Sequence, residues 1–272
     1  MVQNTTVKLR KVIASTGSAL VAFSGGVDSS LLAAMAKGAL EDKVIAALVV
    51  TELVSSEEVE EARATAKEIG IPLEIVRLSV LGDKAFVENP PDRCYHCKRM
   101  IFEALDEVRR DHGLAVLMDG TNADDARSDR PGLRALKEMR VRSPLAEAGM
   151  SKTSVRRLAS SLGLRVAEKP ANPCLATRIP FGEKVDAGKL RQIESVESGL
   201  HDLGFSQVRV RHHGSVARIE VAPKDLARLL RRRKAVVKIV KRAGFTYAAL
   251  DLQGYRSGSM EESRKQTTSS IS

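Results

Sequence analysis

Tryptophan is absent from the 272-residue sequence, and aromatic residues make up only 3% of it. Proteins that bind single-stranded nucleic acid stack its bases on aromatic side chains, so this chain has few residues for such contacts. No apolar run approaches the roughly 20 residues of a membrane helix, and residues 1–10 lack the apolar core of a signal peptide. We therefore expect a cytoplasmic globular protein with no membrane or nucleic-acid partner.

Cysteine is also scarce, with three residues in the whole chain. An odd number of cysteines and no export signal argue against a disulfide framework and favour reactive or metal-bound thiols. Apolar residues make up 43% of the sequence, which is enough for a core in one large domain or two modest ones.

Acidic residues are nearly missing from residues 205–244, which hold twelve Lys and Arg against only Glu220 and Asp225. This stretch alone accounts for the formal net charge of +10, and the rest of the chain is balanced. For the question of a nucleic-acid partner, the location of this charge therefore matters more than its size. We interpret the run from Arg231 to Lys234 as a solvated helix junction or a subunit contact.

A glycine turn at residues 24–30 lacks the Lys-Ser or Lys-Thr of a nucleoside triphosphatase loop and the GxGxxG of a dinucleotide site. It follows a short apolar run, and Gly25 and Gly26 let backbone N–H groups approach a ligand. The helix that opens at Asp28 attracts anions at its N-terminus. The pattern predicts a phosphate cradle and resembles the pyrophosphate (PP) loop of N-type ATP pyrophosphatases. A Gly-Gly turn without a ligand is the alternative.

Strand and helix patterns alternate along the first part of the chain, which predicts an α/β fold with a doubly wound parallel sheet. In such a sheet the ligand lies at the carboxyl ends of the strands. The expected strands cover 18–23, 43–50, 73–78 and 114–118, and the expected helices cover 5–17, 27–37, 57–69, 99–111 and 151–162. Ser55 and Glu58 fit a capping box. Residues 82–98, with Asn89-Pro-Pro, are expected to form an extended loop.

Two irregular stretches carry candidate ligands. The turn at residues 119–125 combines carboxylates with Gly120 at a strand end, which suits Mg²⁺ and nucleotide contacts; a solvated acidic turn is the alternative. Residues 168–184 are proline-rich and resemble a loop held over a site, where Arg178 could meet a phosphate.

We place the domain boundary near Val185, so that residues 1–185 form the nucleotide domain. Residues 186–260 then form a small α/β domain for substrate binding or oligomerisation, and residues 261–272 form a disordered tail. The expected helices of the small domain cover 186–203, 224–231 and 234–242, and its expected strands cover 205–211, 216–221 and 245–250. Strand alternation puts Arg209 and Arg211 on one face, as anion ligands or as solvated side chains.

The three cysteines allow several kinds of site. Cys94 and Cys97 are separated by two residues, and Cys174 lies far along the chain. A structural zinc site needs four ligands, and His96 would have to be the fourth. Unligated thiols are a second possibility. The third is a [4Fe–4S] cluster on three cysteines, which leaves one iron open for an exogenous sulfide.

Several long strings resemble the LarE family of ATP-dependent sulfur transferases. They include Cys94-Tyr-His-Cys97 and Pro173-Cys-Leu-Ala-Thr-Arg178. In full they occupy residues 89–98, 120–125, 130–132, 142–145, 173–178, 208–214, 217–220 and 254–260. Together with the apolar run and glycine turn that begin near residue 18, they extend the resemblance from about residue 18 to residue 260.

The resemblance implies a specific reaction. ATP would adenylylate each carboxylate of pyridinium-3,5-biscarboxylic acid mononucleotide, and sulfur would displace AMP, to make the thiocarboxylates of the nickel-pincer nucleotide cofactor. Members with a single cysteine sacrifice the thiol that matches Cys174, whereas members with three cysteines hold a cluster that delivers sulfide. This chain is similar to the cluster type. The implied cofactors are ATP, Mg²⁺ and a [4Fe–4S] cluster, and a homo-oligomer is expected.

The resemblance also implies roles for single residues. Asp28 would hold Mg²⁺, and Cys174 and Asp28 would be the catalytic residues. The expected ATP-binding residues are Ser24, Gly25, Gly26, Asp28, Ser29, Ser30, Gly120 and Arg178. The expected substrate-binding residues are Arg209, Arg211 and Arg256, because the guanidinium fork suits phosphate and carboxylate. The expected cluster ligands are Cys94, Cys97 and Cys174.

Two rival functions fit parts of the pattern. A tRNA thiolase also combines a PP-loop with a cysteine-held cluster, and it would use the basic C-terminal segment to bind the phosphate backbone. A sensor domain would bind ATP without hydrolysing it. A gel shift with tRNA and an assay of pyrophosphate release separate these functions from the sulfur transferase.

Overall fold

Four parallel strands form the central sheet of the computed structural model, in the order β3-β2-β1-β4. Leu20 lies opposite Ile45 on one neighbouring strand and Leu117 on the other. The strands are β1 (Ala19–Ala22), β2 (Val44–Val50), β3 (Leu73–Arg77) and β4 (Val116–Met118). The structure describes residues 2–127, 131–169 and 172–256.

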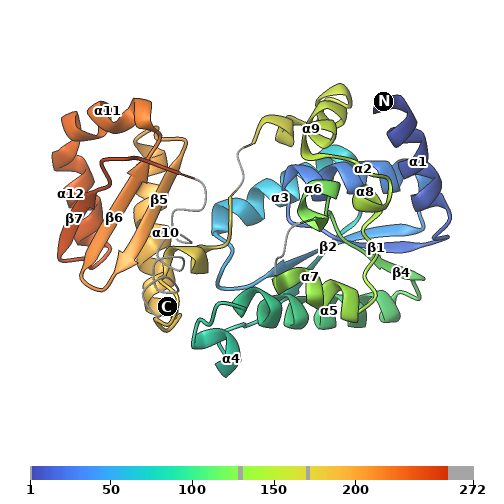
Figure 1. The fold of residues 1–272 in the computed structure, drawn as a ribbon, viewed down its shortest axis with the longest axis horizontal. Helices are drawn as coiled ribbons and strands as arrows, with labels where there is room; N and C mark the ends of the chain where they lie inside the picture. The colour runs from blue at the N-terminus through green and yellow to red at the C-terminus, as the bar shows by residue number, and fades with distance from the viewer. Residues whose placement is uncertain (1, 128–130, 170–171, 257–272) are drawn as a thin grey trace, which may run out of the picture. The chain divides into compact units, whose positions relative to one another are not determined.

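Helices cover both faces of this sheet, as Figure 1 shows. Ala19 and Val21 of β1 belong to the core that α1 (Val2–Ala14), α2 (Val27–Leu40) and α9 (Lys152–Ser161) cover. Leu20, between them, belongs to a second core with α5 (Arg93–Asp111) and α7 (Pro131–Glu138). A strand buried on both faces is apolar throughout, which is why β1 and β2 are continuous apolar runs. The expected doubly wound α/β fold is confirmed.

The strand order reverses direction between β1 and β4. The chain goes from β1 to β2 on one side of the sheet and later adds β4 on the other side. In open α/β sheets, ligands bind outside the carboxyl ends of the strands at such a switch point. The glycine turn follows β1 and the acidic turn follows β4, so both lie at this position.

The helix α3 (Ser56–Ile69) begins and ends as its sequence predicts. The Ser55 hydroxyl accepts a hydrogen bond from the Glu58 N–H at 3.2 Å, and the Glu58 carboxylate accepts one from the Ser55 N–H at 3.1 Å. Gly70 ends the helix in the left-handed conformation, with φ of 74°. The predicted capping box is therefore confirmed.

Residues 82–98 are not the extended loop that we expected. A short helix, α4 (Lys84–Val87), lies in this range, and α5 begins at Arg93 rather than at residue 99. The two prolines, Pro90 and Pro91, precede α5, where they cost no helical hydrogen bond. The polar residues after them carry no apolar periodicity, and for that reason the pattern did not indicate a helix.

The amphipathic helix expected over 151–162 is present as α9, with one correction. We expected Val155, Ala159 and Leu162 on its apolar face; Val155 and Ala159 are buried, but Leu162 is 46% exposed. Leu162 follows the last helical residue, so the helical periodicity no longer fixes its direction. Short helices α6 (Ala123–Ala126), α8 (Pro144–Glu147) and η1 (Arg165–Glu168) complete this part of the chain.

The chain divides into two compact units. The first contains residues up to Val80 together with 92–171, and the second contains residues 81–91 together with 172 onward. This division falls at residue 171 and not near Val185. Asn89 explains why 81–91 joins the second unit, because its buried amide donates to the carbonyl oxygens of Pro180 at 2.7 Å and Glu183 at 3.0 Å.

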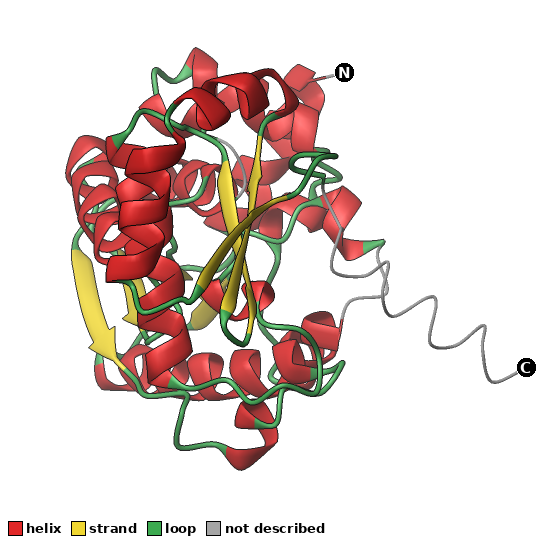
Figure 2. Cartoon of the chain, turned by 90° about the vertical axis from the view of Figure 1, so that its left-hand side faces the viewer, coloured by secondary structure: helices red, strands yellow, loops and turns green. Residues whose placement is uncertain are grey.

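The second unit contains a three-stranded sheet in the order β5-β6-β7, which Figure 2 shows with its helices. Strands β5 and β6 are antiparallel to each other, and β6 and β7 are parallel. The strands are β5 (Val208–His213), β6 (Val216–Val221) and β7 (Tyr247–Leu250). The helices are η2 (Leu175–Arg178), α10 (Ala187–Asp202), η3 (Pro223–Asp225), α11 (Leu226–Arg231) and α12 (Arg233–Arg242).

The expected tail at 261–272 lies outside the described residues, as do Arg130 and residues 257–260 of the family strings. Among the helices that the structure describes, none has both the length and the apolar composition to cross a membrane.

Candidate active site

The glycine turn is held by its own residues and by a neighbouring helix. The Ser29 hydroxyl accepts from the Ser24 N–H at 3.2 Å and donates to the Gly26 carbonyl at 3.1 Å. Gly25 has φ of 69°, and a Cβ placed there would lie 2.8 Å from the Ala62 Cβ. Only glycine satisfies both the conformation and the close approach. The turn therefore presents its backbone directly at the N-terminus of α2.

The serines of the turn differ in their accessibility. Ser24 is exposed, whereas Ser29 and Ser30 are buried. The Ser30 hydroxyl is fully buried and makes no hydrogen bond to the described residues. In this arrangement the Ser24 side chain is exposed and its hydroxyl accepts from the Gly26 N–H at 3.4 Å, and Ser29 fixes the shape of the turn.

Asp28, the expected metal ligand, already has two partners. Its carboxylate accepts from the Asn122 amide at 3.1 Å and forms an ion pair with the Lys152 ammonium group. Asn122 lies in the turn at 119–125 that the sequence indicated, whereas Lys152 was not singled out. Lys152 lies in the first turn of α9, where a cation opposes the helix dipole. That unfavourable position is the signal that could have identified it.

The turn after β4 is built around buried polar groups. Asn122 caps α6, accepting from the N–H groups of Asp124 and Asp125 at 3.0 Å each. Asp119 is also buried, and it accepts hydrogen bonds from the hydroxyls of Thr121 and, at 2.5 Å, Ser143. Most of its polar groups therefore have partners within the protein, and a freely solvated acidic turn does not describe it.

Gly120 connects this turn to the glycine loop. A Cβ at Gly120 would lie 2.8 Å from the backbone nitrogen of Ser29. The end of β4 therefore packs directly against the first turn of α2, which places Gly120 beside the proposed phosphate cradle. No three His, Cys, Asp or Glu side chains among the described residues gather closely enough to hold a metal ion.

Cys94 and Cys97 lie on a helix and not on the expected loop. They occupy the first turns of α5, where positions three apart are neighbours on one face. Cys94 is exposed and Cys97 is half-buried, and neither forms a disulfide bond with a described residue. His96 points elsewhere, with its Nε2 3.6 Å from the Asp92 carboxylate. This geometry does not favour His96 as a zinc ligand beside the two cysteines.

Cys174 lies in the second unit, immediately before η2. Its backbone carbonyl accepts from the guanidinium of Arg178 at 3.1 Å. Arg178 is fully buried and also bonds Glu197 twice, at 3.0 and 2.9 Å. Its remaining contacts are to the Pro173 carbonyl, the Thr177 hydroxyl and the Asn172 side chain. Every N–H of Arg178 thus has a protein partner, and a phosphate contact would require some of these bonds to break.

Arg209 and Arg211 are buried, each only 6% exposed, so the interpretation as a solvated strand face is wrong. Arg211 bonds the Glu220 carboxylate at 3.0 and 2.9 Å and donates to the Thr177 carbonyl at 3.0 Å. The Arg209 guanidinium lies over the Tyr255 ring, 5.4 Å from its centroid. Burial lowers the pKa of Arg209, and the nearby Arg178 cation lowers it further.

These residues form one charged cluster inside the second unit. Three guanidinium groups, from Arg178, Arg209 and Arg211, lie near the buried carboxylates of Glu197 and Glu220. Neither carboxylate was predicted as part of the site. Glu197 interrupts the apolar face of α10, and this break in periodicity could have drawn attention to it. The expected Arg256 is half-buried at the end of the described residues.

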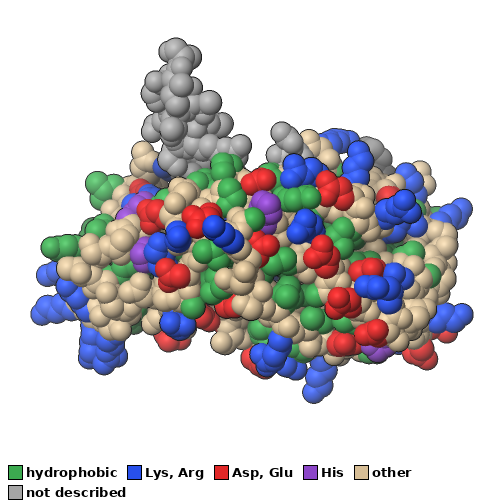
Figure 3. Space-filling model, turned by 90° about the horizontal axis from the view of Figure 1, so that it is seen from below, with side chains coloured by type: hydrophobic (Ala, Val, Ile, Leu, Met, Phe, Trp, Pro, Cys, Tyr) green, Lys and Arg blue, Asp and Glu red, His purple; other side chains and the backbone are tan. Residues whose placement is uncertain are grey.

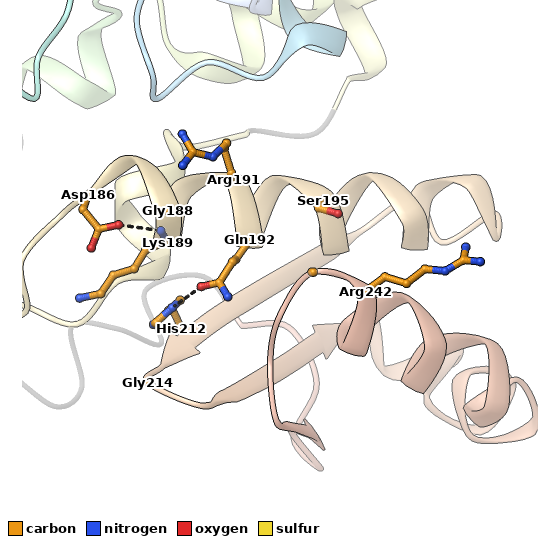
Figure 4. Close-up of a pocket in the computed structure, with 10 residues that line it drawn as sticks. Asp186, Gly188, Lys189, Arg191, Gln192, Ser195, His212, Gly214 and Arg242 are labelled. Atoms are coloured by element: carbon orange, nitrogen blue, oxygen red, sulfur yellow. Dashed lines mark hydrogen bonds between the residues drawn. The ribbon is translucent and has the colours of Figure 1, made fainter.

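The second unit also has a hollow of about 660 Å³ between α10, the turn after β5 and the end of α12 (Figure 4). Lys189 and Arg242 line it, and at its floor the His212 ring meets the Gln192 side chain at 3.2 Å. Burial lowers the pKa of His212, with Lys189 as a second cause. None of the predicted site residues lines this hollow.

Comparison with known proteins agrees with the geometry. The family model described as NAD synthase matches residues 1–89, which include the glycine turn. The fold and the turn at the switch point define an N-type ATP pyrophosphatase, a PP-loop enzyme. Three relatives extend the match along the chain.

An uncharacterized protein of Synechocystis sp., slr1717, is 38% identical over 96% of this chain and 98% of its own length. The pyridinium-3,5-bisthiocarboxylic acid mononucleotide synthase of Lactiplantibacillus plantarum is 37% identical over 89% of this chain and 88% of its own. The uncharacterized protein MJ0830 of Methanocaldococcus jannaschii is 32% identical over 88% of this chain and 90% of its own length. The chain belongs to the LarE family, as does the Lactiplantibacillus synthase, and is an ATP-dependent sulfurtransferase.

Proposed function

We propose that this enzyme acts on pyridinium-3,5-biscarboxylic acid mononucleotide. A carboxylate oxygen of the substrate attacks the α-phosphorus of ATP, which releases pyrophosphate and leaves an acyl adenylate. Sulfide then adds to the acyl carbon and AMP leaves, so that one oxygen of the carboxylate is replaced by sulfur. The second carboxylate reacts in the same way. The observation that carries the proposal is the glycine turn at the switch point of the sheet, in a chain that matches the Lactiplantibacillus synthase over most of its length.

The first unit would bind ATP. The backbone of Gly25 and Gly26, the Ser24 hydroxyl and the N-terminus of α2 would face its phosphates, because the N–H groups at the start of a helix and the helix dipole favour anions. Ser29, Ser30 and Gly120 would shape this cradle. Asp28 would hold Mg²⁺, since carboxylate oxygen is the ligand type that this ion prefers. The bound ion would supply positive charge against the phosphates.

The second unit would bind the mononucleotide substrate. Arg209, Arg211 and Arg256 would hold its phosphate and carboxylates. The buried position of Arg209 and Arg211 supports this role, because a guanidinium shielded from water binds an anion more strongly than an exposed one. Arg178 would contribute by fixing the Cys174 loop instead of by binding ATP.

The sulfur would come from a [4Fe–4S] cluster on Cys94, Cys97 and Cys174. The placement of Cys94 and Cys97 one helical turn apart on α5 supports this choice, because thiolates are the usual ligands of such clusters. When bound, the cluster would present sulfide from its open iron. In the alternative, the Cys174 thiolate attacks the acyl adenylate itself, and elimination then leaves dehydroalanine on the protein and sulfur on the product.

We further propose a small-molecule substrate rather than tRNA. On the face shown in Figure 3, Lys and Arg side chains are interspersed with Asp and Glu. Several surface cations are in ion pairs, such as Arg99 with Glu103. The working form would be a cytoplasmic homo-oligomer. Exposed apolar side chains in the second unit, among them Tyr247 and Leu252, support an interface there.

Pyrophosphate release tests the proposed reaction. We expect release from ATP only when the mononucleotide substrate is present, with one pyrophosphate for each carboxylate activated. Release with tRNA but not with the mononucleotide would support the thiolase instead. Binding of ATP with no release under any of these conditions would support the sensor.

A further inference from the structure

Glu197 is a carboxylate on the apolar side of α10. Its neighbours on that side, Ile193, Val196 and Leu200, are fully buried, and Glu197 itself is 6% exposed. Burying a charged carboxylate is costly unless it is paired and its lone pairs are satisfied. The partners of Glu197 therefore show what its carboxylate holds in place.

The partners of Glu197 connect two parts of the proposed site. Oε1 accepts from the Arg178 Nε at 3.0 Å and from the Val210 N–H at 2.9 Å, and Oε2 accepts from the Arg178 Nη2 at 2.9 Å. Val210 stands between Arg209 and Arg211 on β5, an edge strand. The carboxylate therefore binds the backbone of the strand that carries both substrate-binding arginines.

Arg178 continues the connection to Cys174. Its Nη1 donates to the Cys174 carbonyl at 3.1 Å, and it also bonds the Pro173 carbonyl and the Thr177 hydroxyl. A continuous path of hydrogen bonds thus runs from Val210 through Glu197 and Arg178 to Cys174. All four residues belong to the second unit.

We propose that Glu197 is the positioning residue for Cys174. Through Arg178 it fixes the loop that carries the thiol at a set distance from β5, where Arg209 and Arg211 hold the substrate. This inference rests on the proposed function, and it holds for either sulfur source because Cys174 takes part in both. Glu197 does not touch the substrate and exchanges no proton with it.

Two variants test the proposal. Glu197→Gln alone leaves the buried Arg178 cation without its carboxylate, and this variant can fail to fold. Glu197→Gln combined with Arg178→Met removes both charges together, and the amide oxygen still accepts from the Val210 N–H. Removing both partners of a buried pair is often neutral for stability, so the double variant keeps the fold but loses the anchor of the Cys174 loop.

The first measurement is the rate at which iodoacetamide alkylates Cys174, in a background carrying Cys94→Ser and Cys97→Ser. It needs no substrate, so it gives a result even if the proposed function is wrong. We expect the double variant to unfold at the wild-type temperature but to be alkylated on the order of tenfold faster, the factor that corresponds to one hydrogen bond. Asp225→Asn, which weakens the ion pair with Arg228 on α11, should leave the rate unchanged. A wild-type alkylation rate in the stable double variant overturns the proposal.

The second measurement separates positioning from stability in the three-cysteine protein. We expect the double variant to keep substrate-dependent pyrophosphate release and the KM for ATP, and to lose at least tenfold in the rate of thiocarboxylate formation. A purely structural role for the ion pair would predict that sulfur transfer returns once stability returns. Wild-type sulfur transfer in the stable double variant would therefore also overturn the proposal.

Discussion

The carboxylate of Asp28 forms an ion pair with the ammonium group of Lys152, although the two residues are 124 positions apart in the sequence. Asp28 lies in the first turn of α2, and Lys152 lies in the first turn of α9. The pair stands directly beside the glycine turn that would bind ATP. We infer that the ammonium group balances the carboxylate until the nucleotide and its metal bind.

Replacing Asp28 tests the position of the active site. Asp28→Ala should abolish AMP formation and leave the fold intact, because it removes the proposed metal and pyrophosphate contact without removing core volume. The measurements are AMP formation by chromatography and the thermal unfolding temperature. Asp42→Ala is the control, since Asp42 is an exposed acid paired with Lys37. Normal AMP formation in Asp28→Ala would show that the active site lies elsewhere.

Gly25 and Gly17 form a matched pair for testing the shape of the glycine turn. Both have positive φ, but a Cβ at Gly17 meets nothing within 4 Å, whereas one at Gly25 meets Ala62 at 2.8 Å. Gly17→Ala should cost about 1–2 kcal/mol of the free energy of unfolding, from backbone strain alone. Gly25→Ala should cost roughly 1–3 kcal/mol more from overpacking and should weaken ATP binding. Denaturant unfolding and calorimetric ATP titration provide the measurements.

Equal losses of stability in the two glycine variants, with ATP affinity unchanged in both, would contradict this account of the turn. The comparison is informative because the conformational effect is shared and only the contact with α3 differs.

Removing the Arg211 side chain should have a larger effect on stability than a solvated arginine would. Arg211→Ala removes two charged hydrogen bonds from the fully buried Glu220, which keeps its ion pair with Arg218 at 3.3 Å, so we expect a loss of roughly 1.5–3 kcal/mol in the second unit. Arg211→Met combined with Glu220→Gln should recover most of that stability but not substrate binding, while ATP affinity stays normal throughout. The control is Arg191→Ala, an exposed arginine on α10. Loss of ATP affinity equal to the loss of substrate affinity would refute this division between the units.

The sulfur source is tested by iron content and protein mass. Protein isolated without oxygen should be brown and contain about four irons per chain. Changing any one of Cys94, Cys97 and Cys174 to Ala should lose both the iron and sustained sulfide-dependent turnover. If Cys94→Ala and Cys97→Ala keep activity and the used wild-type protein is lighter by one H₂S at Cys174, then Cys174 is the sacrificed donor and the cluster assignment is wrong.

Local sequence signals predicted the first unit well. An apolar strand, two glycines and a helix start are enough to identify the turn at residues 24–30, and Ser55 with Glu58 identified the start of α3. The start of α5 was missed because Arg93 to Lys98 are polar and follow two prolines. Helical structure there depends on packing, which apolar periodicity does not reveal.

The electrostatic part of the site depends on contacts between distant residues. Strand alternation correctly put Arg209 and Arg211 on one face but could not show that Glu220 and the Thr177 carbonyl bury Arg211. Similarly, the motif that contains Arg178 suggested a phosphate ligand, whereas the structure uses its guanidinium to hold the chain around Cys174. A sequence shows that an arginine is present, but its partner is set by the tertiary fold.

The transfer of oxygen from substrate to AMP tests the central claim most directly. The mononucleotide is prepared with a heavy oxygen isotope in its carboxylates and incubated with enzyme, ATP and sulfide, and the products are analysed by mass spectrometry. Adenylylation of the carboxylate predicts that each AMP carries one heavy oxygen and that each thiocarboxylate formed has lost one. Unlabelled AMP would contradict the account, because ATP would then have been cleaved without activating the substrate.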